Sequence, residues 1–274
     1  MAIHRLEISN SSYTADNFVT LTAYSSHLKG RGDISIYQEA TSNKNVPIIV
    51  LLHGVYGSHW VWSQLGGVHK VYQQLRSSGL NEFVLVMPSD GAHAEGSGYL
   101  PLKNADYEAW IVDDVISAVI QTQPMCSSSS NIYITGLSMG GYGALCLGAK
   151  HPTIFSGISA HSSITELDDF NHFVDEHTLK PLKKTTDKYK GDVFKTLSAN
   201  KKTLPPLRFD CGKDDVLFSA NTALAKKLVD ENVPHTFDIF AGTHCWEYWH
   251  EHVAKTMIFF AQLESKTHTI KIRK

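Results

Sequence analysis

Short, almost wholly apolar segments recur along the chain, and each is separated from the next by a stretch long enough to form a helix. Strands that are buried on both faces of a parallel sheet have this composition, because helices cover the sheet on either side. The alternation therefore predicts a doubly wound, mostly parallel α/β sheet, in which ligands bind beyond the carboxyl ends of the strands. The predicted strands are 48–52, 83–87, 132–135, 157–160, 207–210 and 236–240.

Two earlier segments, 17–24 and 33–37, alternate between apolar and polar residues and flank a glycine-containing turn. This pattern predicts a pair of antiparallel N-terminal strands that begin the sheet. The helices between the strands are expected at 67–78, 106–121, 138–150, 218–231 and 246–264.

Two polar stretches interrupt the alternation, at about 88–104 and at about 162–204. Long excursions of this kind inside a compact domain are usually lids or insertions. No internal repeat or linker divides the sequence, so residues 1–274 are expected to form one α/β domain that carries these two lid-like insertions.

Charge and hydropathy exclude several classes of partner. The 274 residues include 25 Lys and Arg against 27 Asp and Glu, a net charge of −2 without any basic block, so we expect no nucleic-acid binding. The longest strongly apolar stretch is about a third of the roughly 20 residues that span a bilayer, so no membrane segment is expected. No apolar segment precedes Glu7, which favours a cytoplasmic location without a secretory signal.

The four cysteines form no CxxC pair and are expected to be small buried residues rather than metal ligands.

The segment GLSMGG at 136–141 directly follows one predicted strand and begins a predicted helix. This is the G-x-S-x-G pattern in the strand–turn–helix context that a nucleophile elbow requires. The flanking glycines let the strand and the helix approach closely, and the helix N-terminus favours the negative charge that develops during acyl transfer. Ser138 is therefore the candidate nucleophile.

A serine nucleophile needs a general base and a carboxylate that orients the base. In α/β-hydrolases both follow the serine along the chain, in the order Asp and then His. Asp214 and Asp215 lie together in the loop after strand 207–210, and His244 follows the last predicted strand through a glycine. His161, at the end of strand 157–160, is expected to line the substrate pocket.

The oxyanion of an acyl-transfer reaction needs backbone donors. One such donor usually lies in the loop after the first buried parallel strand, which here reads HGVYG, and another is the N–H after the nucleophile. These positions are Val55 and Met139, with Tyr56 as a further candidate. Tyr56, Trp60 and Trp246 lie near the candidate loops and are expected to contact the substrate.

Four segments, HGVYGSHWVW, GLSMGGYGA, CGKDD and AGTHCWEYW, resemble the corresponding blocks of the esterase D family of α/β-hydrolases, particularly its tributyrin-esterase-like members, with S-formylglutathione hydrolases as more distant relatives. The resemblance runs from about residue 15 to 264. By position it implies Ser138 as nucleophile, Asp215 as acid and His244 as base. It also implies an enzyme that uses no cofactor and acts on small esters. No metal is expected, because the sequence contains no evident cluster of metal ligands. The chain departs from the family pattern in the 88–104 loop and at His161, where a small residue is expected.

These observations predict a serine carboxylesterase that hydrolyses small, short-chain acyl esters through an acyl-enzyme. A thioesterase of the S-formylglutathione hydrolase type and an acyltransferase are alternatives within the same chemistry. A non-catalytic binding module on a hydrolase scaffold is the alternative of a different class, and a fluorophosphonate probe that failed to label Ser138 would favour it. The expected partner is a small-molecule ester. The sequence leaves the oligomeric state open, a homo-oligomer included.

Overall fold

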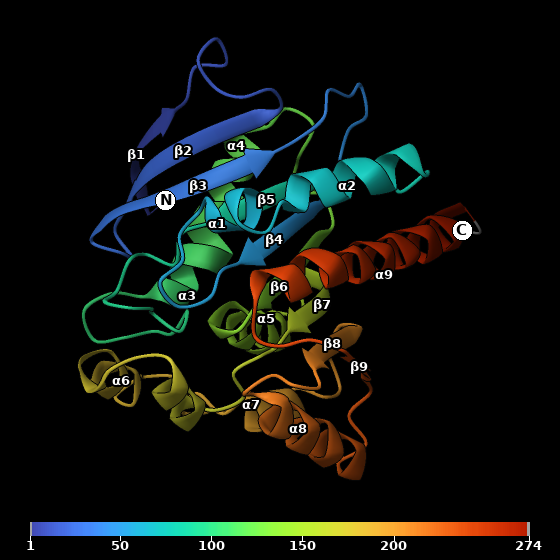
Figure 1. Ribbon diagram of the computed structural model, residues 1–274. Helices are drawn as coiled ribbons and strands as arrows, with labels where there is room; N and C mark the ends of the chain where they lie inside the picture. Colours follow the sequence, from blue (N-terminus) through green and yellow to red (C-terminus); the bar gives the residue numbers. More distant parts are fainter. Residues whose placement is uncertain (1, 273–274) are drawn as a thin grey trace.

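A nine-stranded mixed sheet forms the centre of the computed structural model, which describes residues 2–272 and the side chains through residue 265. The strands are β1 (Ile3–Ile8), β2 (Phe18–Ser25), β3 (Gly30–Tyr37), β4 (Ile48–Leu52), β5 (Val84–Pro88), β6 (Ile132–Leu137), β7 (Phe155–His161), β8 (Leu207–Gly212) and β9 (Thr236–Phe240). Their order across the sheet is β1-β2-β3-β5-β4-β6-β7-β8-β9 (Figure 1).

The N-terminal strands differ in direction from the rest of the sheet. β1, β2 and β3 pair antiparallel, and β3 is also antiparallel to β5. From β5 to β9 every pairing is parallel. This confirms the predicted α/β class with antiparallel N-terminal strands. β1 was not predicted, because an edge strand with mostly exposed side chains carries little apolar pattern.

Helices cover both faces of the sheet (Figure 1). One face packs on α1 (Val61–Gln64), α2 (Val68–Ser77) and α9 (Trp246–Ile272). The other packs on α3 (Tyr107–Ala109), η1 (Trp110–Val115), α4 (Ile116–Thr122), α5 (Met139–Lys150) and α8 (Phe218–Asp230). The expected helix 106–121 is one continuous helical stretch whose middle, η1, is π-helical.

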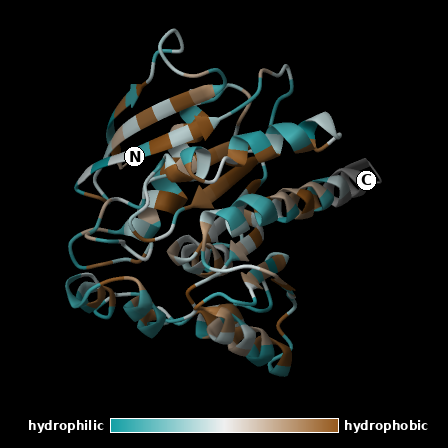
Figure 2. Cartoon of the chain, viewed as in Figure 1, coloured by the Kyte–Doolittle hydropathy of each residue, from teal (hydrophilic) through white to brown (hydrophobic). Residues whose placement is uncertain are grey.

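Two apolar clusters, one on each face, form the core. In β4 the side chains of Ile48, Val50 and Leu52 join one cluster, and those of Ile49 and Leu51 join the other. In Figure 2 the central strand β4 is therefore apolar throughout, whereas β2 and β3 alternate in hydropathy. Among the described residues, no helix is both long and apolar enough to span a bilayer.

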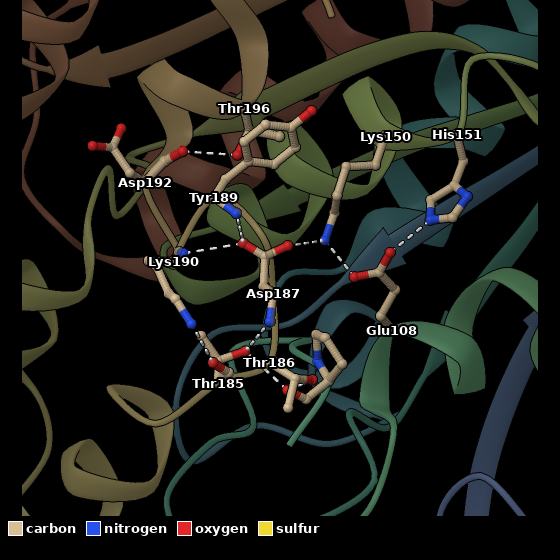
Figure 3. Close-up of polar contacts among 12 residues, drawn as sticks. Glu108, Lys150, His151, Thr185, Thr186, Asp187, Tyr189, Lys190, Asp192 and Thr196 are labelled. Carbon is tan, nitrogen blue, oxygen red and sulfur yellow. Dashed lines mark hydrogen bonds and ion pairs between the residues drawn. The ribbon is translucent and has the colours of Figure 1, made fainter. Parts of the chain in front are cut away.

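The second insertion contains three short helices, η2 (Leu167–His172), α6 (Glu176–Leu182) and α7 (Val193–Ala199). Its later part is attached to α5 by the partly buried network in Figure 3. The Asp187 carboxylate accepts hydrogen bonds from Lys150 Nζ at 3.0 Å and from the Tyr189 N–H at 3.0 Å. Lys150 also pairs with Glu108, whose carboxylate bonds His151 Nε2 at 2.7 Å. This insertion is therefore fixed to the helix that follows Ser138.

Candidate active site

Ser138 lies in the sharp turn between β6 and α5, with φ 54° and ψ −118°. A non-glycine residue in this region costs roughly 1–3 kcal/mol, a strain that is typical of functional sites. The surrounding backbone holds the turn, since the Ser138 N–H donates to the His161 carbonyl at 3.0 Å. The side chain lies at the amino end of a 12-residue helix and is 2% exposed.

The glycines of the motif are required by close backbone contacts. A Cβ on Gly136 would lie 2.2 Å from the Gly140 carbonyl oxygen, and a Cβ on Gly140 would lie 2.1 Å from the Leu52 carbonyl oxygen. Neither contact is sterically possible, so only glycine lets β6, α5 and β4 approach this closely. The strand–motif–helix context predicted from the sequence is confirmed.

Loops after three different strands bring Ser138, His244 and Asp215 together. His244 Nε2 lies 3.0 Å from Ser138 Oγ, and His244 Nδ1 lies 3.0 Å from both carboxylate oxygens of Asp215. Asp215 follows β8, and His244 follows β9 through Gly242, whose φ is 137°. The serine hydroxyl, the imidazole and the carboxylate thus form a continuous hydrogen-bonded series.

The carboxylate of Asp215 is completely buried, whereas Asp214 is exposed. Burial by itself would raise the pKa of Asp215, but hydrogen bonds from His244 and from the Leu217 N–H outweigh it and hold that pKa below its usual value. The Leu217 bond is 2.8 Å long. Asp215 is therefore ionised at neutral pH and can stabilise a protonated His244.

Two backbone N–H groups beside Ser138 are free to bind an oxyanion. Among the described residues, neither the Val55 nor the Met139 N–H has a hydrogen-bond acceptor. The Tyr56 N–H, the further candidate, instead donates to the Glu95 carbonyl at 2.9 Å and is not free. His53 supports the loop, because its Nε2 accepts from the Asp90 N–H at 3.0 Å.

Two aromatic rings enclose the imidazole of His244. Phe173, from the second insertion, stacks on it with centroids 4.8 Å apart and an interplanar angle of 24°. Trp249 of α9 meets it edge-on at 5.0 Å, and its indole N–H donates to Ser162 Oγ. Both contacts restrict rotation of the imidazole and shield it from water.

The structure places His161 in the interface between the sheet and α9, contrary to the expectation that it lines the substrate pocket. Its side chain is completely buried, with Nδ1 3.0 Å from Asp210 and Nε2 2.8 Å from Thr256 Oγ1. Alternate residues of a strand face opposite sides, and His161 faces the α9 side. Asp210 is also held by Arg208 and Tyr248.

The three other side chains that were expected to contact the substrate, Tyr56, Trp60 and Trp246, lie in different surroundings from one another. Tyr56 is 71% exposed and donates its hydroxyl hydrogen bond to Glu95. Trp60 lines a 320 Å³ cavity between β2, β3 and α1, to which none of the residues Ser138, His244 and Asp215 contributes. Trp246 packs edge-on against Trp62 and Trp249. Tyr56 and Trp60 both lie in the loop between β4 and α1 that also carries Val55.

Sequence reasoning did not single out Phe173 or Glu95. Both lie in the polar insertions. These insertions fold back onto the site from distant parts of the chain, so no local sequence pattern reveals the contact. A usable signal was present for Phe173, because an aromatic residue in a polar, lysine-rich segment indicates packing against another part of the protein. Three of the four cysteines are buried, as expected, while Cys245 is half-buried.

The sheet order, the strained serine between strand and helix, and the order Ser, Asp, His along the chain define an α/β-hydrolase of the serine type. The family described as "Putative esterase" matches residues 25–260. The chain belongs to this esterase family and is a serine ester hydrolase whose substrate is a small-molecule ester.

Individual proteins agree with this assignment. An acetyl esterase of Caldicellulosiruptor saccharolyticus is 25% identical over 247 residues, which cover 83% of this chain and 88% of that protein. A ferulic acid esterase structure superposes with a TM-score of 0.72 at 23% identity, covering 94% of this chain and 99% of that one. An S-formylglutathione hydrolase of Staphylococcus aureus superposes with a TM-score of 0.76 at 17% identity, covering 93% and 99%. The structural similarities confirm the fold.

Proposed function

We propose that this protein is a carboxylesterase that cleaves small, short-chain acyl esters through a covalent acyl-enzyme, with Ser138, His244 and Asp215 as its catalytic triad. The observation that carries the proposal is the unbroken series of 3.0 Å contacts from the Ser138 hydroxyl through His244 to Asp215. The acetyl ester cleaved by the curated relative supports a short acyl group.

In the first half of the reaction, Ser138 Oγ attacks the acyl carbon while its proton passes to His244 Nε2. The carbonyl oxygen becomes an oxyanion, which the Val55 and Met139 N–H groups bind. Asp215 stabilises the imidazolium and fixes the tautomer in which Nδ1 carries the proton. When the tetrahedral intermediate collapses, the ester C–O bond breaks, and His244 returns the proton to the leaving alcohol.

In the second half, a water molecule takes the place of the alcohol. His244 accepts a proton from this water, the resulting hydroxide attacks the acyl carbon, and the bond to Ser138 Oγ breaks. The serine regains its proton and the carboxylic acid is released. The same acyl-enzyme formed from a thioester would make the protein a thioesterase, and its capture by a second alcohol would make it an acyltransferase.

The limited space at Ser138 supports a small substrate. The serine is 2% exposed, and Phe173 covers one face of His244. On the other side of the site, a Cβ on Gly96 would lie 2.4 Å from Met139 Sδ, so the 88–104 loop packs closely against a proposed oxyanion residue. A short acyl group requires less displacement of these contacts than a long one.

The test is labelling of the protein with a fluorophosphonate probe, compared with its Ser138→Ala variant. We expect stoichiometric labelling of the native protein, none of the variant, and a loss of kcat on the order of 10⁶-fold. Labelling of Ser138→Ala, or retention of a few per cent of its activity, would refute the triad. Adding S-formylglutathione to the substrate panel tests the thioesterase, and product analysis with an added alcohol tests the acyltransferase.

A cytoplasmic location stays a prediction, which cell fractionation tests.

A further inference from the structure

The carboxylate of Glu95 joins three segments that surround Ser138. Glu95 belongs to the 88–104 loop, and its carboxylate accepts a hydrogen bond from the Tyr56 hydroxyl in the loop after β4. It also accepts bonds from the Asp175 N–H at 2.7 Å and from Thr178 Oγ1 at 2.9 Å, both in the second insertion. Neither insertion thus approaches the site as an independent flap.

The contacts to Tyr56 constrain the proposed oxyanion loop directly. Tyr56 follows Val55 and has a φ of 58°, a left-handed conformation that costs a tyrosine roughly 1–3 kcal/mol. Glu95 binds this residue at both ends, because its backbone carbonyl accepts the Tyr56 N–H and its carboxylate accepts the hydroxyl. The neighbouring Gly96 packs against the side chains of Val55 and Met139.

The contacts to the insertion constrain the other side of the site. Asp175 is the N-cap of α6, and its backbone N–H is bound by Glu95. Two residues earlier, Phe173 stacks on His244. The carboxylate that holds Tyr56 therefore also binds the backbone two residues after Phe173.

Hydrogen bonds from Tyr56 and from the Asp175 N–H lower the pKa of Glu95, so its side chain is charged at neutral pH. A carboxylate has enough acceptor sites for all three of these donors, whereas an amide has a single oxygen. The Tyr56 hydroxyl binds Oε1 and both insertion donors bind Oε2, so a glutamine could accept hydrogen bonds on one of these two sides only and would direct its NH₂ group at the other. Glu95→Gln is therefore a nearly isosteric way to break the connection.

We propose that Glu95 is a positioning residue for the oxyanion hole, which holds Tyr56 in its left-handed conformation so that the Val55 N–H stays aimed at the reacting carbonyl. Through Asp175 and Thr178 it holds Phe173 against His244 as well. This inference rests on the proposed esterase mechanism. The 88–104 loop thereby contributes to turnover, because it keeps the oxyanion hole aligned.

The experiment compares Glu95→Gln and Tyr56→Phe with the control Glu82→Gln. The Glu82 carboxylate also accepts several side-chain hydrogen bonds, from Thr41, Asn43 and Arg76, but it lies outside the site. For each variant we would measure kcat and KM on p-nitrophenyl acetate, the thermal midpoint, and the inhibition constant of an alkylboronic acid. The boronate forms a tetrahedral adduct on Ser138 and reports binding of the oxyanion.

Loss of a complete oxyanion donor costs about 10²–10³ in kcat, so misalignment of one donor should cost about 10- to 100-fold. We expect this loss for Glu95→Gln and most of it for Tyr56→Phe, with KM within about twofold of the native value. Boronate affinity should fall by a similar factor, while Glu82→Gln should match the native enzyme in all three. Tyr56 is exposed, so Tyr56→Phe keeps the test valid if Glu95→Gln folds poorly.

The inference is overturned if both site variants match the control, or if kcat falls while boronate affinity is unchanged. Fluorophosphonate labelling separates this result from a failure of the proposed function. A native protein that is labelled at Ser138 and tolerates Glu95→Gln would refute the positioning role alone. A native protein that is not labelled would refute the esterase mechanism itself.

Discussion

Replacing Asp215 by asparagine keeps the size of the side chain but should invert the tautomer of His244. In the structure both carboxylate oxygens lie 3.0 Å from His244 Nδ1, and Oδ1 also accepts the Leu217 N–H at 2.8 Å. An asparagine has one oxygen, and the Leu217 N–H favours the position of Oδ1 for that oxygen, because it donates there. The amide NH₂ then faces Nδ1, which must become an acceptor. The proton moves to Nε2, where it prevents that nitrogen from accepting the proton of Ser138.

This wrong tautomer cost about 10⁴-fold in kcat in a serine protease, and the same geometry here predicts a loss of that order. At about 1.36 kcal/mol for each factor of ten, the loss corresponds to about 5.4 kcal/mol of transition-state stabilisation. Asp214→Asn is the matched control, because Asp214 is exposed and its backbone N–H, which the substitution leaves intact, donates to the Gly242 carbonyl at 3.0 Å. Its kcat should stay within about twofold of the native value.

The assay is steady-state hydrolysis of p-nitrophenyl acetate by both variants, with thermal midpoints as a check on folding. The rate of fluorophosphonate labelling should fall for Asp215→Asn in parallel with kcat, because both reactions use Ser138 as the nucleophile. If Asp214→Asn were the impaired variant, or if Asp215→Asn kept more than a tenth of native activity, the assignment of the orienting carboxylate would be wrong.

Three further predictions concern substrate size, packing and pH. Acetyl to butyryl p-nitrophenyl esters should be turned over faster than dodecanoyl or feruloyl esters, since each methylene gains at most about 0.8 kcal/mol where the pocket buries it, and a faster dodecanoyl reaction would refute a short pocket. Gly140→Ala should lower the free energy of unfolding by about 1–3 kcal/mol or more, because the added Cβ would meet the Leu52 carbonyl. Gly30→Ala, whose added Cβ would lie 3.8 Å from its nearest neighbour, should leave the free energy of unfolding unchanged. Urea denaturation measures both variants. Burial by itself would raise the pKa of Glu108, but His151 and Lys150 lower it, so this group stabilises the fold above its unfolded pKa of about 4.3 and the stabilisation is lost as the pH falls further. The urea midpoint should therefore drop between about pH 5 and pH 3, and Glu108→Gln should show a smaller drop; an equal drop would contradict the reasoning.

The architecture could be predicted because its signals are local. Strands buried on both faces are apolar at successive positions, as in β4, and helices between them repeat at their own spacing. The nucleophile elbow is equally local, since the clashes that require Gly136 and Gly140 arise within one strand–turn–helix unit and the strand beside it. β1 was missed because an exposed edge strand buries too few side chains to produce such a pattern.

The sequence by itself determined the succession of the strands from β2 to β9 and of the long helices between them, the strained turn at Ser138 and the order of the three triad candidates, because each depends on neighbouring residues. Only the tertiary structure decided which groups at the strand ends face one another. His161 ends a strand as Ser138 does, yet it points to α9, because the direction of a side chain at a strand end depends on register and on the helix that covers that face. The approach of Phe173 to His244 and of Glu95 to Tyr56 likewise depends on packing between segments far apart in the chain, and no local pattern encodes it.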